Sequence, residues 1–140
     1  MLDAYVEVAK TRVAGPVPMC DDPGAKKVAA RAKSEIEHMK LIMYSNFDHM
    51  LDAASKGEAV PMVDRARYRY DASMVADQCL ELSSLMLKAG GSGGIRLGSE
   101  MLDRHLDIFA SQAHIANISE PFAVNLGGIL FGQEPSDPSL

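Results

Sequence analysis

Residues 23–57 read PGAKKVAARAKSEIEHMKLIMYSNFDHMLDAASKG, and this stretch decides the fold class. Apolar side chains recur in it at steps of three and four residues, the spacing of one face of an α-helix. They are Val28, Ala32, Ile36, Met39, Met43, Phe47, Met50 and Ala54. Asp22 followed by Pro23 is typical of a helix start, and Gly57 is typical of a helix stop. The stretch predicts one continuous helix of about 34 residues, roughly 50 Å long, as in elongated helical bundles.

Helical spacing also occurs on both sides of this stretch. Apolar side chains recur at this spacing from the first residues to Val13, which predicts a first helix. Gly15-Pro16-Val17-Pro18 is expected to end this helix, because prolines remove amide donors. A further helix is predicted after Pro61, and Gly90-Gly91 is expected to end it. The apolar face of that helix consists of Tyr68, Ala72, Val75, Cys79, Leu82, Met86 and Ala89. This spacing favours near-antiparallel packing of neighbouring helices.

The last part of the chain predicts one more amphipathic helix and a shorter apolar piece. Ser99 is a candidate N-cap for a helix that continues to Pro121. The apolar face of this helix is expected to comprise Leu102, Leu106, Phe109, Ala113 and Ala116. The shorter piece spans 122–131, and residues 133–140 are predicted to form a mobile tail. Together the patterns predict an all-α protein, an up-down four-helix bundle over residues 1–132.

The composition argues against several classes of function. The 19 acidic and 14 basic residues give a net charge of -5 and are mixed along the chain, so nucleic acid and membrane partners are not expected. Cys20 and Cys79 lack the spacing of metal ligands, which indicates reduced thiols in a cytoplasmic protein. Glu35–His38 has the Glu-x-x-His spacing of di-iron bundles, which use it in pairs, but Asn46 replaces the carboxylate in the nearest second copy. No metal site is predicted.

A pattern in the second half of the chain carries a resemblance to a known family. Its elements are Ala89-Gly90-Gly91, Leu102, Arg104, Asp107-Ile108, Ala113-His114-Ile115-Ala116-Asn117 and Gly128-Ile129-Leu130-Phe131-Gly132. This pattern resembles the C-terminal helical domain of the acyl-CoA dehydrogenase fold. Within that fold it is most similar to the oxygenase components of two-component flavin-dependent monooxygenases, of the 4-hydroxyphenylacetate hydroxylase and dibenzothiophene monooxygenase type.

The resemblance implies a function and a set of partners. The protein would use reduced flavin, FMN or FAD, and O2 to hydroxylate a small aromatic substrate. A separate flavin reductase would supply the cofactor, and the enzyme would form a homotetramer. The rest of the flavin pocket would come from further domains, so the isolated chain is expected to be inactive.

The same resemblance singles out four residues. His114 would face the reactive edge of the flavin as a hydrogen-bond donor or a base, and Gly90, Gly91 and Ser92 would approach the cofactor. From the residues alone, His114 can equally be a helix histidine satisfied by solvent or a backbone carbonyl. The glycine-rich segment can likewise be a plain connector between helices, because dinucleotide-binding glycine motifs follow a strand.

Two alternative functions stay open from the sequence. One is an acyl-CoA dehydrogenase whose base lies elsewhere, since Ile115 stands where dehydrogenases with a base on this segment carry a glutamate. The other is a helical module or truncated remnant without catalytic activity, which would serve only assembly.

Overall fold

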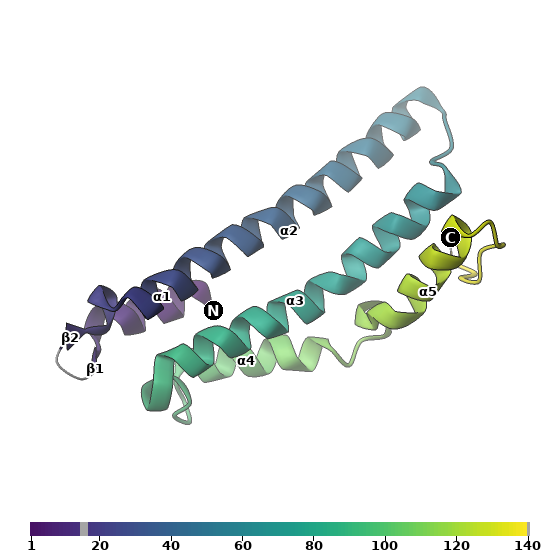
Figure 1. Ribbon diagram of the computed structural model, residues 1–140. Helices are drawn as coiled ribbons and strands as arrows, with labels where there is room; N and C mark the ends of the chain where they lie inside the picture. The colour runs from purple at the N-terminus through teal and green to yellow at the C-terminus, as the bar shows by residue number, and fades with distance from the viewer. Residues whose placement is uncertain (15–16, 140) are drawn as a thin grey trace. The chain divides into compact units, whose positions relative to one another are not determined.

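A computed structural model describes residues 1–14 and 17–139 of the chain (Figure 1). The described residues form five α-helices, two short 3-10 helices and one two-stranded antiparallel ribbon. The α-helices are α1 (Leu2–Thr11), α2 (Pro23–Lys56), α3 (Met62–Gly94), α4 (Glu100–Ser111) and α5 (Ser119–Leu130). The short elements are β1 (Val13–Ala14), β2 (Val17–Pro18), η1 (Met19–Asp21) and η2 (Ile115–Asn117). The predicted all-α class is confirmed, because the ribbon contributes only two residues per strand.

The chain divides into two compact units, of which the first comprises Met1–Glu37 and Gln78–Ser111. It contains α1, the ribbon, η1, the first part of α2, the last part of α3, and α4. Its core is formed by small and apolar side chains that are at most 2% exposed, namely Tyr5, Ala32, Leu82, Met86 and Met101. Tyr5 donates a hydrogen bond to the carbonyl oxygen of Ala25 at 3.2 Å, which joins α1 to α2. Burial, with Asp22 nearby, raises the pKa of Tyr5, so its phenol stays protonated and keeps this bond.

The second unit comprises His38–Asp77 and Gln112–Leu140, and polar contacts hold much of it. The buried Asn46 side chain on α2 donates to Asp71 on α3 at 3.0 Å, and His49 Nδ1 is hydrogen-bonded to the hydroxyl of Tyr68. Ser119 at the start of α5 donates to Asp77 on α3 at 2.8 Å. Within this unit α2 and α3 are therefore cross-linked by side chains close to the connection between them.

The end of the chain returns to α5 in this second unit. Asn125 is 4% exposed, and its Oδ1 atom accepts hydrogen bonds from the backbone N–H of Ser136 at 2.6 Å and of Asp137 at 3.1 Å. The Ser136 hydroxyl donates to the same oxygen at 3.0 Å. The mobility predicted for residues 133–140 stays a prediction, and Leu140 lies outside the described residues.

The predicted limits of the long helices agree with the structure. The Asp22 carboxylate accepts a hydrogen bond from the backbone N–H of Ala25 at 2.7 Å, so Asp22 caps the start of α2. Gly57 has a φ of 69°, and the N–H of Glu58 bonds to the carbonyl of Ala53 at 2.9 Å, which is the Schellman arrangement of a helix end. Ser99 caps α4 by accepting from the N–H of Leu102 at 3.2 Å.

Three details of the predicted fold are wrong. Val13 lies in a strand rather than in the first helix, because the chain pairs with Pro18 there. The helix that begins after Ser99 ends at Ser111 and does not reach Pro121. Pro121 does not end that helix but lies in the first turn of the separate helix α5, where a missing N–H is tolerated, and α5 contains most of the shorter apolar piece predicted at 122–131. The segment after Gly91 is helical up to Gly94, where an irregular loop was expected, although the helix does break at Gly91 as predicted. The predicted end at Gly15-Pro16 falls outside the described residues.

Several large apolar side chains of α2 are exposed in the second unit. Phe47 is 49% exposed, and Leu41 and Leu51 are 67% and 69% exposed. Isolated apolar side chains on a surface need no explanation, but several on successive turns of one helix indicate a contact surface.

Removing the cap of α2 should destabilise the chain. Asp22→Ala takes away the acceptor for the N–H of Ala25, and we expect the free energy of unfolding to fall by about 1 kcal/mol. Urea denaturation followed by far-UV circular dichroism measures this change. Asp21→Ala is the matched control, because it removes the same charge one residue earlier at an exposed position of η1. An equal loss in both variants would attribute the effect to charge rather than to capping.

The two thiols should differ in reactivity. Burial raises the pKa of the Cys79 thiol, whereas Cys20 is exposed. Because the thiolate is the reacting species, we expect a disulfide reagent to modify the chain in two phases at mildly alkaline pH. Cys20→Ser should abolish the fast phase and leave the slow one. A fast phase that survives in Cys20→Ser would show that Cys79 is reachable in the folded chain.

Candidate functional site

The predicted cofactor residues lie at a bend near the end of α3. Gly91 has φ 60° and ψ -156°, a conformation reached essentially only by glycine, and it breaks the helical geometry of α3 at this point. The Arg12 guanidinium lies against this bend and donates a hydrogen bond from Nη1 to the carbonyl oxygen of Gly90. A Cβ atom on Gly91 would stand 2.6 Å from the same nitrogen. The backbone conformation requires glycine, and an added Cβ atom would also have to displace the end of the Arg12 side chain.

Gly90 and Ser92 differ from Gly91 in what surrounds them. Gly90 is buried, and a Cβ atom there would lie 2.8 Å from Cε of Met101 on α4. Gly90 therefore allows α3 and α4 to pack closely and is itself covered. Ser92 is exposed on the turn that follows. The Ser99 hydroxyl donates to the carbonyl of Gly94 at 2.6 Å, which ties the start of α4 to the end of α3.

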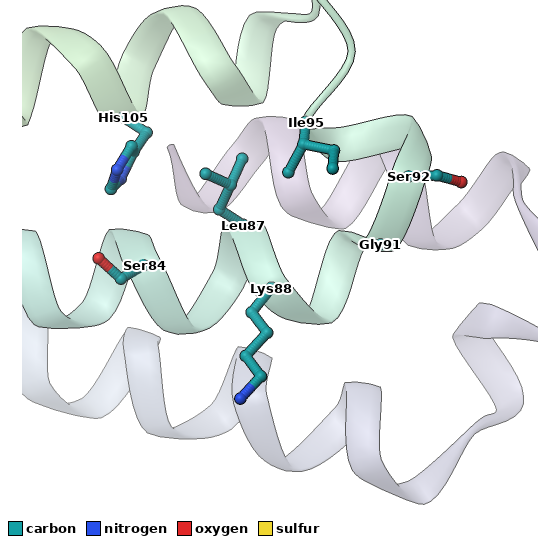
Figure 2. Close-up of a pocket in the computed structure, with 7 residues that line it drawn as sticks. All are labelled: Ser84, Leu87, Lys88, Gly91, Ser92, Ile95 and His105. Atoms are coloured by element: carbon teal, nitrogen blue, oxygen red, sulfur yellow. The ribbon is translucent and has the colours of Figure 1, made fainter.

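An open hollow of about 450 Å³ lies at this end of the first unit. Residues from the end of α3, the turn after it and α4 surround it, namely Ser84, Leu87, Lys88, Gly91, Ser92, Ile95 and His105 (Figure 2). Gly91 and Ser92 thus face a space that can hold a ligand, whereas Gly90 does not line it. In Figure 2 the ring of His105 and the side chains of Leu87 and Ile95 point into this space, and Lys88 points away.

His105 lines this hollow and was not among the predicted site residues. Its Nδ1 atom lies 3.0 Å from the hydroxyl of Ser83, which is 1% exposed on α3. The inner face of α4 is formed by Met101, His105 and Ile108, at helical steps of four and three. Leu106 and Phe109, placed on that face by the sequence, are 51% and 59% exposed, so the predicted face was wrong. The missed signal was the spacing of Met101 and Ile108, with a histidine between them.

His114 lies outside any α-helix, which corrects the predicted helical position. It is the N-cap of η2, and its Nδ1 atom accepts a hydrogen bond from the backbone N–H of Ala116 at 3.1 Å. A nitrogen that accepts from an N–H carries no proton of its own, so in the neutral ring the proton lies on Nε2. The imidazole is exposed, and Nε2 is its donor. His114 belongs to the second unit, and Gly90, Gly91 and Ser92 belong to the first.

Over 1–14 and 17–139, no group of three or more histidine, cysteine, aspartate or glutamate side chains is arranged to hold a metal ion. Glu35, from the Glu-x-x-His element, is ion-paired with Arg31 at 2.6 Å. None of the helices in the described part of the chain is long and apolar enough to span a membrane.

Comparison with known protein families decides the classification. The family model described as acyl-CoA dehydrogenase, C-terminal domain, matches residues 1–118. This chain belongs to that family. The match covers α1 to α4 and η2, and so includes both the bend at Gly91 and His114. A search of curated protein sequences gave no match.

Solved structures similar to this acyl-CoA dehydrogenase C-terminal domain include a monooxygenase and a hydroxylase. The HsaA monooxygenase from M. tuberculosis is 26% identical with a TM-score of 0.87, and the 3-HSA hydroxylase from Rhodococcus sp. RHA1 is 27% identical with a TM-score of 0.88. Each match covers 99% of this chain and 35% of the other. The chain thus spans about a third of the length of these proteins.

A third solved structure supports the fold alone. XiaF from Streptomyces sp., in complex with FADH2 and glycerol, has a TM-score of 0.88 at 21% identity. The match covers 99% of this chain and 36% of XiaF. This chain and XiaF therefore share the same fold over nearly the whole length of this chain.

The bend at Gly91 provides a direct test of the local geometry. In Gly91→Ala the added Cβ meets Arg12 in a backbone conformation that alanine avoids, so we expect a loss of about 1–3 kcal/mol in unfolding free energy. Gly93→Ala is the matched control, since nothing lies within 4 Å of its Cβ position and the residue is helical. It should stabilise the chain by roughly 0.5–1 kcal/mol. Urea denaturation of both variants measures the difference, and equal effects would contradict the bend.

Proposed function

We propose that the chain is the helical C-terminal part of a flavin-dependent monooxygenase that uses reduced flavin and O2 to hydroxylate a small aromatic substrate. The observation that carries the proposal is the match over 99% of the chain to a monooxygenase and a hydroxylase at 26% and 27% identity. We propose reduced flavin as the cofactor, and the proposal includes both FMN and FAD. The activity would belong to a longer assembly, of which this chain is one part.

The residues at the bend of α3 fit a flavin in part. Gly91 and Ser92 line an open hollow, and the guanidinium of Arg12 lies beside Gly91 but is not one of the residues that line this hollow. Gly90 is covered by Met101 and would act only by holding the bend. When bound, reduced flavin supplies the electrons that activate O2. The chain would contribute Gly91 and Ser92 as contacts.

The hydrogen bond at His114 refines the role proposed for this residue. Its Nδ1 atom is occupied by the N–H of Ala116, so the neutral ring offers an N–H at Nε2 and no free lone pair. A donor of this kind can orient and stabilise an oxygen atom of the substrate or cofactor. To act as a base, His114 would first have to break the hydrogen bond that its Nδ1 atom accepts from the N–H of Ala116. We therefore propose that His114 acts as a hydrogen-bond donor.

The remaining parts of the proposal concern partners and location. A separate reductase would supply the reduced flavin, and a homotetramer would cover the exposed apolar face of α2 that includes Leu41, Phe47 and Leu51. The two free cysteines fit a reducing compartment, for which we propose the cytoplasm. The chain alone is expected to be inactive, because further parts of the enzyme would complete the flavin pocket.

The proposal is tested by flavin binding and oxygen consumption. The purified chain, alone and with the product of any adjacent reading frame, is supplied with reduced FMN or FAD and with phenolic substrates. We expect substrate-dependent oxygen consumption in the reconstituted mixture, reduced about a hundredfold in His114→Ala. His114→Gln should retain more activity, because its amide can place an N–H near the position of Nε2. His38→Ala, at an exposed position of α2, is the control expected to keep full activity.

Two results would overturn this assignment. Acyl-CoA-dependent reduction of an acceptor dye, in place of oxygen consumption, would identify a dehydrogenase, for which Ile115 supplies no base. Absence of flavin binding in every mixture would leave a helical assembly module without catalytic activity.

A further inference from the structure

The hollow beside His105 has the features of a small-molecule site in its own right. Its volume of about 450 Å³ lies within the range of ligand pockets and suits a molecule of one or two rings. Leu87 and Ile95 provide apolar walls, and Ile95 is 57% exposed as long as nothing covers it. All the lining residues belong to the first unit, so the site is formed within a single compact part of the chain.

His105 supplies the polar group that faces this space. Its Nδ1 atom is held by the hydroxyl of the buried Ser83 at 3.0 Å, which fixes the orientation of the ring on α4. No hydrogen bond to Nε2 is formed by the part of the chain that the structure describes. The imidazole therefore presents one anchored and one available nitrogen, the usual arrangement of a histidine that contacts a ligand.

The other polar groups around the hollow narrow the ligand chemistry. The Ser84 hydroxyl donates to the carbonyl of Leu80 at 2.8 Å, so its proton is used inside α3. Lys88 points away from the space in Figure 2, and none of the seven lining residues is acidic. A charged ligand would consequently find no counterion directed at it, and burying an unpaired charge is costly. The site suits a neutral molecule.

The ring of His105 then selects the polar group of that molecule. The Ser83 hydroxyl donates its one proton to the carbonyl of Leu80 at 2.9 Å, so it accepts from Nδ1–H of His105, and in the neutral ring Nε2 is an acceptor. A ligand hydroxyl can donate to this nitrogen. A carboxylate has no proton to donate to it and brings a charge.

We propose that the hollow between α3 and α4 binds a small neutral ring compound that bears one hydroxyl group, with the ring between Leu87 and Ile95 and the hydroxyl on Nε2 of His105. This inference does not rest on the proposed flavin chemistry. It depends only on the contacts of His105 and on the apolar walls.

The experiment is an NMR titration of the full chain, without flavin, with phenol and cyclohexanol as probes and benzoate as the charged comparison. We expect millimolar binding of both hydroxyl compounds, with amide shifts at Gly91, Ser92 and Ile95. Benzoate should bind at least threefold more weakly. Because no flavin is present, failure here leaves the proposed monooxygenase function to its own test.

Two variants of His105 separate ligand contact from a structural role. His105→Asn keeps an amide near the position of Nδ1 for Ser83 but has no atom at Nε2, and we expect about tenfold weaker binding. His105→Gln can place its amide near Nε2 and should stay within about threefold of the unchanged chain. Leu87→Trp fills the hollow and should abolish binding, and His38→Ala should leave it unchanged. Circular dichroism verifies that each variant is folded.

Clear outcomes contradict the proposal. Equal losses in His105→Asn and His105→Gln would show that the ring only packs, and tighter binding of benzoate would assign an anion site. Absence of shifts at Gly91, Ser92 and Ile95 with either hydroxyl probe would show that the hollow binds no such compound.

Discussion

The contact between Met101 and the glycine-bearing end of α3 governs the geometry of the first unit. Met101 is 1% exposed, and its Cε atom fills the space where a side chain on Gly90 would stand. Protein interiors are packed closely enough that one additional carbon atom at such a contact forces a shift. With Met101 seated there, the next turn of α4 brings His105 to Ser83. The hollow and the available nitrogen of His105 follow from this packing.

The two histidines of interest illustrate how a hydrogen bond at one ring nitrogen determines what the other can do. At His114 a backbone N–H occupies Nδ1, and because a backbone amide only donates, the neutral ring has a single tautomer. At His105 the Ser83 hydroxyl, whose proton goes to the carbonyl of Leu80, accepts from Nδ1–H and leaves a lone pair at Nε2 of the neutral ring. The first arrangement suits a fixed donor, and the second suits a fixed acceptor. Residue type alone does not distinguish these cases.

Sequence periodicity predicted the long helices well, because local signals mark their ends. Asp22, Gly57 and Ser99 each act through hydrogen bonds to residues no more than five positions away, and these bonds are present. The end of α4 was predicted at Pro121 because no glycine or proline occurs between Ser99 and that residue. The structure ends the helix at Ser111, where no breaking residue stands. Local signals were therefore insufficient at this boundary.

The candidate site was less accessible to prediction because it depends on contacts between distant residues. His105 and Ser83 are 22 positions apart, and their pairing requires the correct inner face of α4. Leu106 and Phe109 are more apolar than His105, so hydrophobicity alone selects the wrong face. His114 and the glycines at positions 90 and 91 were reached through family resemblance. The role of Gly90 as a packing position emerged only from its distance to Met101.

The hydrogen bonds to Asn125 have a practical consequence for the use of this protein. Its buried Oδ1 atom accepts three hydrogen bonds, all from Ser136 and Asp137, a few residues before the last one. Trimming the chain after α5 would leave this oxygen without these donors, and an unsatisfied buried acceptor costs about 1–3 kcal/mol. A label or affinity tag joined at the C-terminus therefore needs a flexible spacer, so that these residues can still reach α5.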